Sequence, residues 1–365
     1  MTRRKDGLWQ QQMTVIENGR KKQKFFYGKT KQEVLHKIKE YQEKQENGLS
    51  IEDAADEWLE WKSATVSFKT AEGYKPAIKR IKNFFAGFYI KNITPALVQS
   101  FIDSIAAQGY KRTTIQRPLD VLRMIYDYFI VHPNSNIKYN PCSSVRLPAG
   151  LKQESRDLAS REDIEIVKRS VNLSFGLFAY FIMFSGLRDG EALAIRREDI
   201  TEDHIIVNKS VSWQTNKPVI KSPKTKYGNR KVNLLDPLKN ALPQTWKGYL
   251  FSADGGKSPL TNTEFRARWN GYCRAAGLAD SRIETHINPN NKHTYNKTIW
   301  TNRIVPYQLR HEFATMCFDA GLDPYDVKVL MGHSDESTAR KIYTHVLESR
   351  RAKSANKLNE YVKKM

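Results

Sequence analysis

The sequence has only three cysteines, Cys142, Cys273 and Cys317, and they are scattered along the chain. Their number and spacing fit neither a zinc site nor a disulfide framework, both of which need paired or clustered thiols. His286 and His293 do not complete a recognisable ligand set with Cys273. We therefore expect free thiols, no metal site and a reducing, cytoplasmic location.

Long apolar runs are also missing. The longest, residues 175–187, is too short to span a bilayer and is interrupted by Ser185 and Gly186. The first six residues lead into polar sequence, so we expect no signal peptide. Both absences argue against a membrane partner.

Acidic residues are scarce relative to basic ones. The chain has 39 Asp and Glu against 60 Lys and Arg, which gives a formal charge of +21. A field of that size attracts polyanions through steering and counterion release. Because Tyr and Phe are abundant, DNA or RNA is a better partner than a membrane surface. The length, 365 residues, suggests two or three domains.

Residues 1–48 form the first predicted domain. Strand-like runs over 8–16 and 21–27 flank an Asn-Gly pair, which is a strong hairpin signal. Thr30 and Glu33 make a capping box for a helix that Gly48 ends. The hairpin is basic, and it is either a solvated face or a sheet that enters a DNA groove. Its candidate DNA-binding residues are Arg20, Lys21, Lys22 and Lys24.

Residues 49–148 read as a bundle of four helices, because apolar residues recur at helical spacing throughout. Thr94-Pro95 marks one helix start, with Thr as N-cap and Pro at the first helical position. Two other helix starts combine positive charge with hydroxyl groups, a combination suited to phosphate binding. The candidate DNA-binding residues there are Lys69, Thr70, Arg112 and Thr113.

Residues 149–365 form the last predicted domain, which mixes helices and strands. An apolar helix is expected over 173–185, followed by strands at 205–207, 210–213 and 230–234. Further helices are expected over 262–276 and from Gln308 onward. The polar, Asn-rich segment 281–304 reads as an insertion at the surface.

The residues that carry chemistry are concentrated in this last domain. Gly186-Leu187-Arg188-Asp189-Gly190-Glu191 comes first, and Val305-Pro306-Tyr307-Gln308-Leu309-Arg310-His311 follows much later. A phosphodiester under attack gathers negative charge on its non-bridging oxygens, and a guanidinium donates two hydrogen bonds to such oxygens without losing its proton. Arg188 and Arg310 are therefore candidates for a phosphate clamp. Glu191, three residues after Arg188, is placed to brace it.

Tyr343, within Tyr343-Thr344-His345, is the candidate nucleophile. A free phenol has a pKa near 10, so it needs neighbouring cations or a base before it attacks. Tyr295, Tyr325 and Tyr361 are rivals, but only Tyr343 follows closely after a Gly-His pair, Gly332-His333.

The departing 5′ oxygen needs a proton, and a lysine on a turn between two strands supplies one as general acid. Lys224 lies in such a segment, although Lys221 and Lys226 remain alternatives by chemistry alone. His333 is a further donor to the phosphate, or else a helix cap.

With these motifs the chain resembles the tyrosine recombinases of the phage integrase family, specifically integrases with an arm-binding domain. The resemblance implies catalytic roles for Arg188, Lys224, Arg310, His333 and Tyr343, with support from Glu191. It favours Lys224 over the neighbouring lysines. One position departs: the family's His-x-x-Arg box opens here with Tyr307, a hydrogen-bonding group but a poor base at neutral pH.

The resemblance also implies the architecture and the reaction. It implies a multidomain, mainly α protein with small β elements: a three-stranded sheet plus helix as arm-binding domain, a helical-bundle core-binding domain and a mixed α/β catalytic domain. A homotetramer would exchange strands between double-stranded DNA attachment sites through a 3′-phosphotyrosyl intermediate, without ATP, metal or other cofactor. An excisionase and a DNA-bending host factor are implied partners.

Three other functions remain open on the residues alone. A type IB topoisomerase shares the chemistry but only nicks and reseals one strand. A basic DNA-binding regulator would form no covalent adduct. A metal-dependent nuclease needs clustered carboxylates, whereas the acidic residues here are dispersed.

Overall fold

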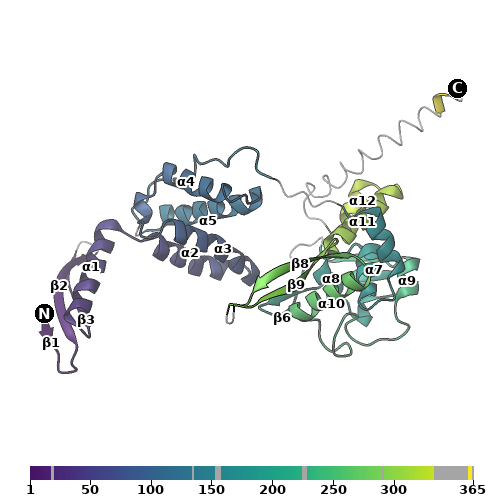
Figure 1. The fold of residues 1–365 in the computed structure, drawn as a ribbon, viewed down its shortest axis with the longest axis horizontal. Coiled ribbons are helices and arrows are strands. Elements are labelled where there is room, and N and C mark those ends of the chain that lie inside the picture. The colour runs from purple at the N-terminus through teal and green to yellow at the C-terminus, as the bar shows by residue number, and fades with distance from the viewer. Residues whose placement is uncertain are drawn as a thin grey trace. The chain divides into compact units, whose positions relative to one another are not determined.

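The computed structural model describes residues 1–17, 20–133, 135–152, 158–223, 228–289, 292–332 and 361–363. The chain divides into two compact units, residues 1–155 and 156–365 (Figure 1). The predicted mainly α character with small antiparallel sheets is confirmed. The first unit contains both the sheet and the helical bundle, so a domain boundary at residue 48 stays a prediction.

The chain begins with a three-stranded antiparallel sheet in the order β1-β2-β3, packed on one helix. The side chain of Phe26 is buried and meets the ring of Tyr41 edge-on, with ring centroids 5.3 Å apart. The backbone N–H of Glu33 donates to the Thr30 hydroxyl, which confirms the expected cap. The elements are β1 (Thr2–Arg3), β2 (Trp9–Glu17), β3 (Arg20–Gly28) and α1 (Lys31–Asn47).

Four α-helices follow within residues 50–131, as predicted. Their apolar faces meet around Trp58, Ile81, Phe101 and Leu122, all of which are buried. Three of the helices begin at a Ser or Thr whose hydroxyl accepts a backbone N–H, which satisfies an otherwise unpaired donor. The elements are α2 (Ile51–Thr65), α3 (Phe68–Phe84), the 3-10 helix η1 (Ile90–Asn92), α4 (Pro95–Ala106) and α5 (Arg112–Val131).

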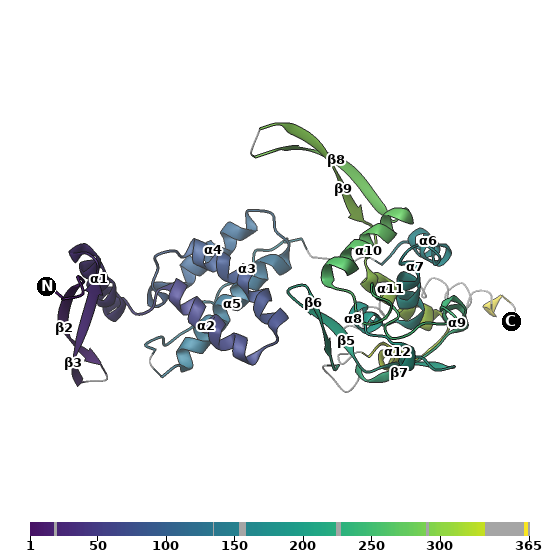
Figure 2. The same ribbon diagram turned by 90° about the horizontal axis from the view of Figure 1, so that it is seen from below.

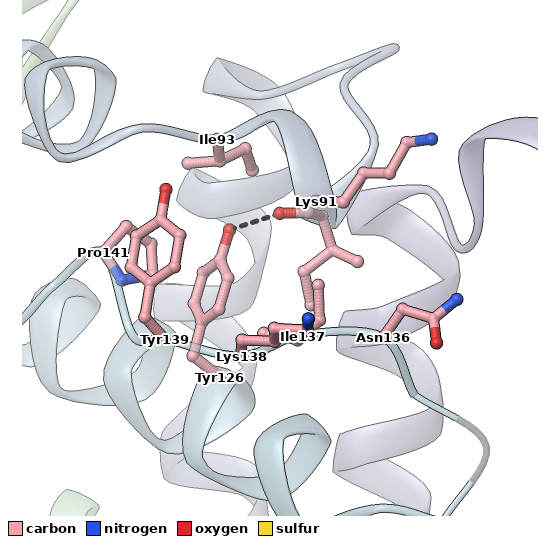
Figure 3. A pocket seen from close by; sticks show the side chains of 9 residues that line it. Lys91, Ile93, Tyr126, Asn136, Ile137, Lys138, Tyr139 and Pro141 are labelled. Carbon is pink, nitrogen blue, oxygen red and sulfur yellow. Dashed lines mark hydrogen bonds between the residues drawn. The ribbon is translucent and has the colours of Figure 1, made fainter.

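A cavity of about 210 Å³ lies where the segment after α5 returns across the bundle (Figure 3). The hydroxyl of Tyr126 donates to the carbonyl of Ile90 at 2.8 Å, which connects α5 to the 3-10 helix. Burial raises the pKa of Tyr126, so the phenol stays protonated. The cavity is lined mainly by Ile90, Ile93, Tyr126, Ile137, Tyr139 and Pro141. We therefore interpret it as a gap in the packing of the bundle.

The second unit is built around the apolar helix α7, which packs against α11 and α9. The sequence placed the start of α7 at Leu173, but the helix begins at Gly176 because Phe175 adopts a left-handed conformation, with φ at 65°. Its helices are α6 (Arg161–Arg169), α7 (Gly176–Ser185), α8 (Asp189–Leu193), the 3-10 helix η2 (Arg197–Asp199), α9 (Asp236–Ala241), α10 (Asn262–Ala275), α11 (Pro306–Asp319) and α12 (Pro324–Met331).

The strands described in this unit form three separate antiparallel pairs, β4-β7, β5-β6 and β8-β9. The strand over 217–221 was not predicted. It begins two residues after the preceding strand ends and pairs with that strand. The bounds are β4 (His204–Val207), β5 (Ser210–Gln214), β6 (Lys217–Lys221), β7 (Arg230–Asn233), β8 (Ala279–Ile287) and β9 (Thr294–Asn302).

The polar segment expected to be a surface insertion forms a long β-hairpin, which was not predicted from the sequence. β8 and β9 pair in register from Ala279↔Asn302 to Ile287↔Thr294 and extend away from the helices of the second unit (Figure 2). The surface position is confirmed, since Ile283 is 72% exposed and Ile287 63% exposed. Within the described residues, no helix combines the length and apolarity needed to cross a membrane.

Candidate active site

Two arginines that lie far apart in the sequence meet at one buried carboxylate. Arg188 Nη1 lies 2.7 Å from Glu191 Oε1, and Arg310 Nη1 lies 3.7 Å from Glu191 Oε2. The Arg188 side chain is 40% exposed, whereas that of Arg310 is 1% exposed. Arg188 therefore faces solvent while Arg310 forms the floor of the site.

A glycine turn brings the two arginines together. α7 ends at Ser185 and is capped by Gly186, whose φ of 65° lies in the left-handed region that favours glycine. A Cβ at this position would lie 2.3 Å from the ring of Phe313, so only glycine lets α7 approach α11 this closely. The Gly186 carbonyl accepts a hydrogen bond from Arg310 Nη1 at 2.6 Å. The same turn thus presents Arg188 and orients Arg310.

Glu191 bonds both the backbone and the side chain of Arg188. The backbone N–H of Arg188, at the start of α8, donates to Glu191 Oε2 at 3.0 Å, so the carboxylate caps the helix that carries it. Its other oxygen pairs with the Arg188 guanidinium. The expected pairing of Arg188 with Glu191 is confirmed.

A third arginine, Arg230, belongs to this cluster and was not singled out from the sequence. It begins β7, and its side chain lies on the Glu191 carboxylate, with Nη2–Oε2 at 2.9 Å and Nη1–Oε1 at 3.3 Å. Arg230 is in phase with buried Val232 on the same strand and with buried Leu234 just after it. A charged residue on an inward-facing strand position is a signal of buried pairing that would have identified it.

The three arginines also donate to three consecutive carbonyls at the C-terminal end of α12. Arg230 Nε donates to Leu330 O at 2.8 Å, Arg310 Nη2 donates to Met331 O, and Arg188 Nη2 donates to Gly332 O at 3.0 Å. The last carbonyls of a helix have no intrahelical partner and carry partial negative charge. The guanidiniums satisfy them.

The cluster carries more positive than negative charge. Three guanidiniums surround one carboxylate among the described residues. Burial alone would raise the pKa of Glu191, but hydrogen bonds and charge from Arg230, followed by Arg188, lower it to about 2. Burial and then the charge of Arg188 lower the pKa of Arg310 to about 9, so Arg310 stays protonated at neutral pH at a cost in folding free energy.

Arg310 has one further donor to offer. Its Nε is buried and makes no hydrogen bond to any of the described residues. An unmet buried donor beside a surplus of positive charge suits an anion with several acceptor oxygens, such as a phosphate.

Tyr307 lies one turn before Arg310 on α11. Its ring meets that of His311 edge-on, with centroids 4.5 Å apart. The phenol is near enough to Arg310 to interact electrostatically with its guanidinium, and this interaction acts to raise the pKa of Arg310. The residue that departs from the family's histidine is thus at the site, and its role stays a prediction.

Three predicted catalytic residues, Lys224, His333 and Tyr343, lie outside the described residues. The described chain reaches Pro223 on one side of Lys224 and resumes at Gly228. Among the described residues, β6 before this gap pairs with β5 and β7 after it pairs with β4, so the two flanking strands do not pair with each other.

Among the rivals considered for two of these roles, Lys226 also lies outside the described residues. Lys221 ends β6. Tyr295, Tyr325 and Tyr361 are 50%, 67% and 64% exposed, and none of them is bonded to the arginine cluster among the described residues. No group of His, Cys, Asp and Glu able to hold a metal occurs within the part of the chain that the structure describes.

The predicted DNA-binding residues of the first unit fall on two surfaces. On β3, Lys21 shares a face with Phe25 and Tyr27, which are 42% and 38% exposed. Lys24 points the other way, and its Nζ lies 4.2 Å from the ring centroid of Tyr41 on α1. Arg20 and Lys22 are also on this strand, but the side chain of Arg20 is outside the described part.

The second surface is formed by the starts of α3 and α5. Arg117 stacks over the ring of Tyr74 at 4.8 Å, one turn or so into each helix, and this contact brings the two starts to the same end of the bundle. Lys69, Arg112 and Thr113 are exposed there, whereas the Thr70 hydroxyl lies 2.9 Å from that of Ser67, within the helix cap.

Comparison with known families decides what this site belongs to. Residues 164–350 match the phage integrase family, and residues 50–106 match the N-terminal SAM-like domain of phage integrases. The first match spans more than half of the chain and contains the whole arginine cluster. The chain belongs to the phage integrase family. It is a tyrosine recombinase, an enzyme that cleaves and rejoins DNA strands without ATP.

The recombinase is similar to a tyrosine recombinase XerC-like protein of Caldanaerobacter subterraneus subsp. tengcongensis, with 26% identity over 94% of this chain and 93% of that protein. Its fold is similar to that of the Tn1549 transposon integrase in complex with circular intermediate DNA, with a TM-score of 0.64, 17% identity and coverage of 84% and 99%. It is also similar to a lambda integrase tetramer bound to a Holliday junction, with a TM-score of 0.56, 14% identity and coverage of 93% and 96%.

Family membership removes two alternatives left by the sequence. A regulator without enzymatic activity and a metal-dependent nuclease do not belong to this family. The predicted family, fold class and recombinase activity are confirmed.

Proposed function

We propose that the arginine cluster binds the scissile phosphate of DNA, with Arg188 and Arg310 on its non-bridging oxygens. The observation that carries this is the surplus of positive charge around Glu191, together with the unbonded Nε of Arg310. Arg188, at 40% exposure, is reached from solvent, and Arg310 holds the deeper oxygen. Guanidiniums in such a site stabilise the extra charge of the five-coordinate transition state.

In this proposal the phenol of Tyr343 gives its proton to solvent, and its oxygen attacks the phosphorus to form a 3′-phosphotyrosyl ester. The bond to the 5′ oxygen breaks, and Lys224 gives that oxygen a proton. His333 donates a hydrogen bond to the phosphate, and Tyr307 does so in place of the family's usual histidine. The ester conserves the energy of the broken bond, so a second 5′ hydroxyl reseals the strand without ATP.

We further propose that the enzyme integrates and excises a mobile element as a homotetramer on double-stranded attachment sites. Supporting similarity comes from a transposon integrase with a circular intermediate DNA and from an integrase tetramer on a Holliday junction. An excisionase and a DNA-bending host factor would set the direction of the reaction.

The first unit supplies two DNA-contacting surfaces in this proposal. The open face of the sheet carries Lys21, Phe25 and Tyr27 on β3 and exposed Gln12 and Thr14 on β2, a mixture of charge, stacking rings and hydrogen-bonding groups. The helix starts at Lys69 and Arg112 would bind backbone phosphates, where free N–H groups and helix dipoles add to the charge.

A suicide DNA substrate, nicked so that the cleaved end diffuses away, tests the proposal. The protein should become covalently attached to the 3′ phosphate, visible as a slower band on a denaturing gel, and EDTA should not prevent it. Mass spectrometry of the adduct peptide should locate the ester on Tyr343, and Tyr343→Phe should form none. Exchange of strands between two labelled duplexes separates recombination from simple nicking and resealing. An adduct on another residue would overturn the assignment.

A further inference from the structure

Arg230 is among the most thoroughly bonded buried cations of the second unit. Its side chain is 5% exposed and makes four hydrogen bonds to three residues: two to Glu191, one to the Leu330 carbonyl and a longer one, at 3.5 Å, to the Gly228 carbonyl. Burying a guanidinium is costly unless its N–H groups find acceptors. Here Nε, Nη1 and Nη2 of Arg230 each donate at least one hydrogen bond. Unlike Arg188, it has little surface left with which to meet DNA.

The bonds of Arg230 fix the plane of the Glu191 carboxylate. A forked guanidinium pairs with both oxygens of a carboxylate only when the two groups are nearly coplanar. Each Glu191 oxygen also accepts one bond from Arg188, through Nη1 at 2.7 Å and the backbone N–H at 3.0 Å. Fixing the carboxylate therefore fixes the direction in which Arg188 points.

The third bond of Arg230 acts on the end of α12. The carbonyls of Leu330, Met331 and Gly332 each accept from a different arginine of the cluster. The chain continues from Gly332 directly into His333 and then to Tyr343. When a phosphate takes up donors of Arg188 and Arg310, their bonds to Gly332 and Met331 compete with it. The Arg230–Leu330 bond meets no such competition.

We propose that Arg230 is a positioning residue for strand cleavage: it holds Glu191 against Arg188 and anchors the end of α12 while the phosphate binds. It does so without contacting DNA itself. The proposal rests on the proposed function of Arg188, Arg310 and Tyr343. It predicts that Arg230 sets the rate of cleavage and leaves DNA affinity unchanged.

The test compares full-length wild type with Arg230→Lys and Arg230→Ala on a suicide substrate under single-turnover conditions. Lysine keeps the charge but cannot bridge both Glu191 oxygens and Leu330, so we expect cleavage to slow about 10-fold with Lys and about 100-fold with Ala. DNA affinity, measured by fluorescence anisotropy, should stay within about 2-fold. Arg303→Lys is the matched control, because Arg303 pairs with another buried carboxylate, Asp163, at 2.8 Å. It should leave both quantities unchanged.

A double-mutant cycle with Glu191→Gln adds a readout that a purely structural role would not move. If Arg230 acts through Glu191, Arg230→Lys should slow the Glu191→Gln enzyme much less than it slows wild type. Cleavage by Arg230→Lys at the wild-type rate would overturn the proposal. So would an equal loss of DNA affinity and cleavage rate in both variants, which indicates a general folding defect. An ester mapped to a residue other than Tyr343 would refute the proposed nucleophile, while the rate ratio would still decide the role of Arg230.

Discussion

Replacing Glu191 with glutamine removes the only carboxylate that the described residues place among the three arginines. Glutamine keeps the shape and one acceptor oxygen but loses the negative charge. Three buried or half-buried guanidiniums would then face one another without a counter-charge. We expect the second unit to lose stability, with little effect on the first.

The size of this loss in unfolding free energy follows from the lowered pKa of the Glu191 carboxyl group. Its pKa falls from 4.5 to about 2, and one unit corresponds to about 1.4 kcal/mol, so ionised Glu191 contributes about 3 kcal/mol at neutral pH. Breaking a buried ion pair by removing one partner costs about 3–5 kcal/mol, which agrees. For a unit of this length each kcal/mol shifts the unfolding temperature by about 2–4 °C, so we expect a drop of about 6–12 °C.

Scanning calorimetry of the full chain measures this, with hydrogen exchange of the α7 and α11 peptides assigning the transition to the second unit. Because the folded-state pKa is depressed, the contribution is complete above pH 4.5 and is lost as the pH falls toward 2. The stabilities of wild type and Glu191→Gln should therefore converge as the solution is acidified. Glu198→Gln is the control: its pair with Arg196 is 55% and 42% exposed and is worth at most about 1 kcal/mol. A Glu191→Gln transition within about 2 °C of wild type, or a gap independent of pH, would refute the reasoning.

Other expectations concern activity and DNA affinity. Tyr307→His should keep single-turnover cleavage near the wild-type rate, and Tyr307→Ala should slow it about 100-fold; full cleavage by the alanine variant would remove Tyr307 from the mechanism. Arg310→Lys should slow cleavage about 10- to 100-fold with affinity nearly unchanged, since one ammonium cannot replace a fork of donors; an unchanged rate would argue against phosphate binding by Arg310. Lys21→Gln should reduce the salt dependence of DNA binding by about one unit of log–log slope, whereas Lys24→Gln, whose ammonium lies on Tyr41, should change it less.

Local signals in the sequence were sufficient for much of the fold. The Asn-Gly pair, the Thr30 cap and the Thr94-Pro95 start act over a few residues, and the elements they predicted are present. Arg188 with Glu191 was also predictable, because the two are three residues apart at a helix start. Each of these inferences needs no knowledge of what lies across the molecule.

The failures involve partners far away in the chain. For the segment of β8 and β9 only a polar surface insertion was predicted. The pairing of the two strands was missed because few of their residues are apolar and each strand is ordered by the other. Arg230 was passed over because its role depends on Glu191 and Leu330, which lie 39 and 100 residues away. Strand pairing and buried ion pairs depend on tertiary contacts, which residue propensities and the spacing of apolar residues do not predict.

The β8–β9 hairpin affects the solubility of the protein when no DNA is bound. Among the described residues each strand pairs only with the other, so the outer edge of each strand has N–H and C=O groups that belong to no strand pair. Such edges recruit strands from neighbouring molecules, the first step toward aggregation. Charged side chains along it, among them Arg282, Glu284 and Lys297, act as gatekeepers against that association. Ile283 and Ile287 are 72% and 63% exposed on this hairpin, and we expect Ile283→Lys or Ile287→Lys to improve solubility at high concentration.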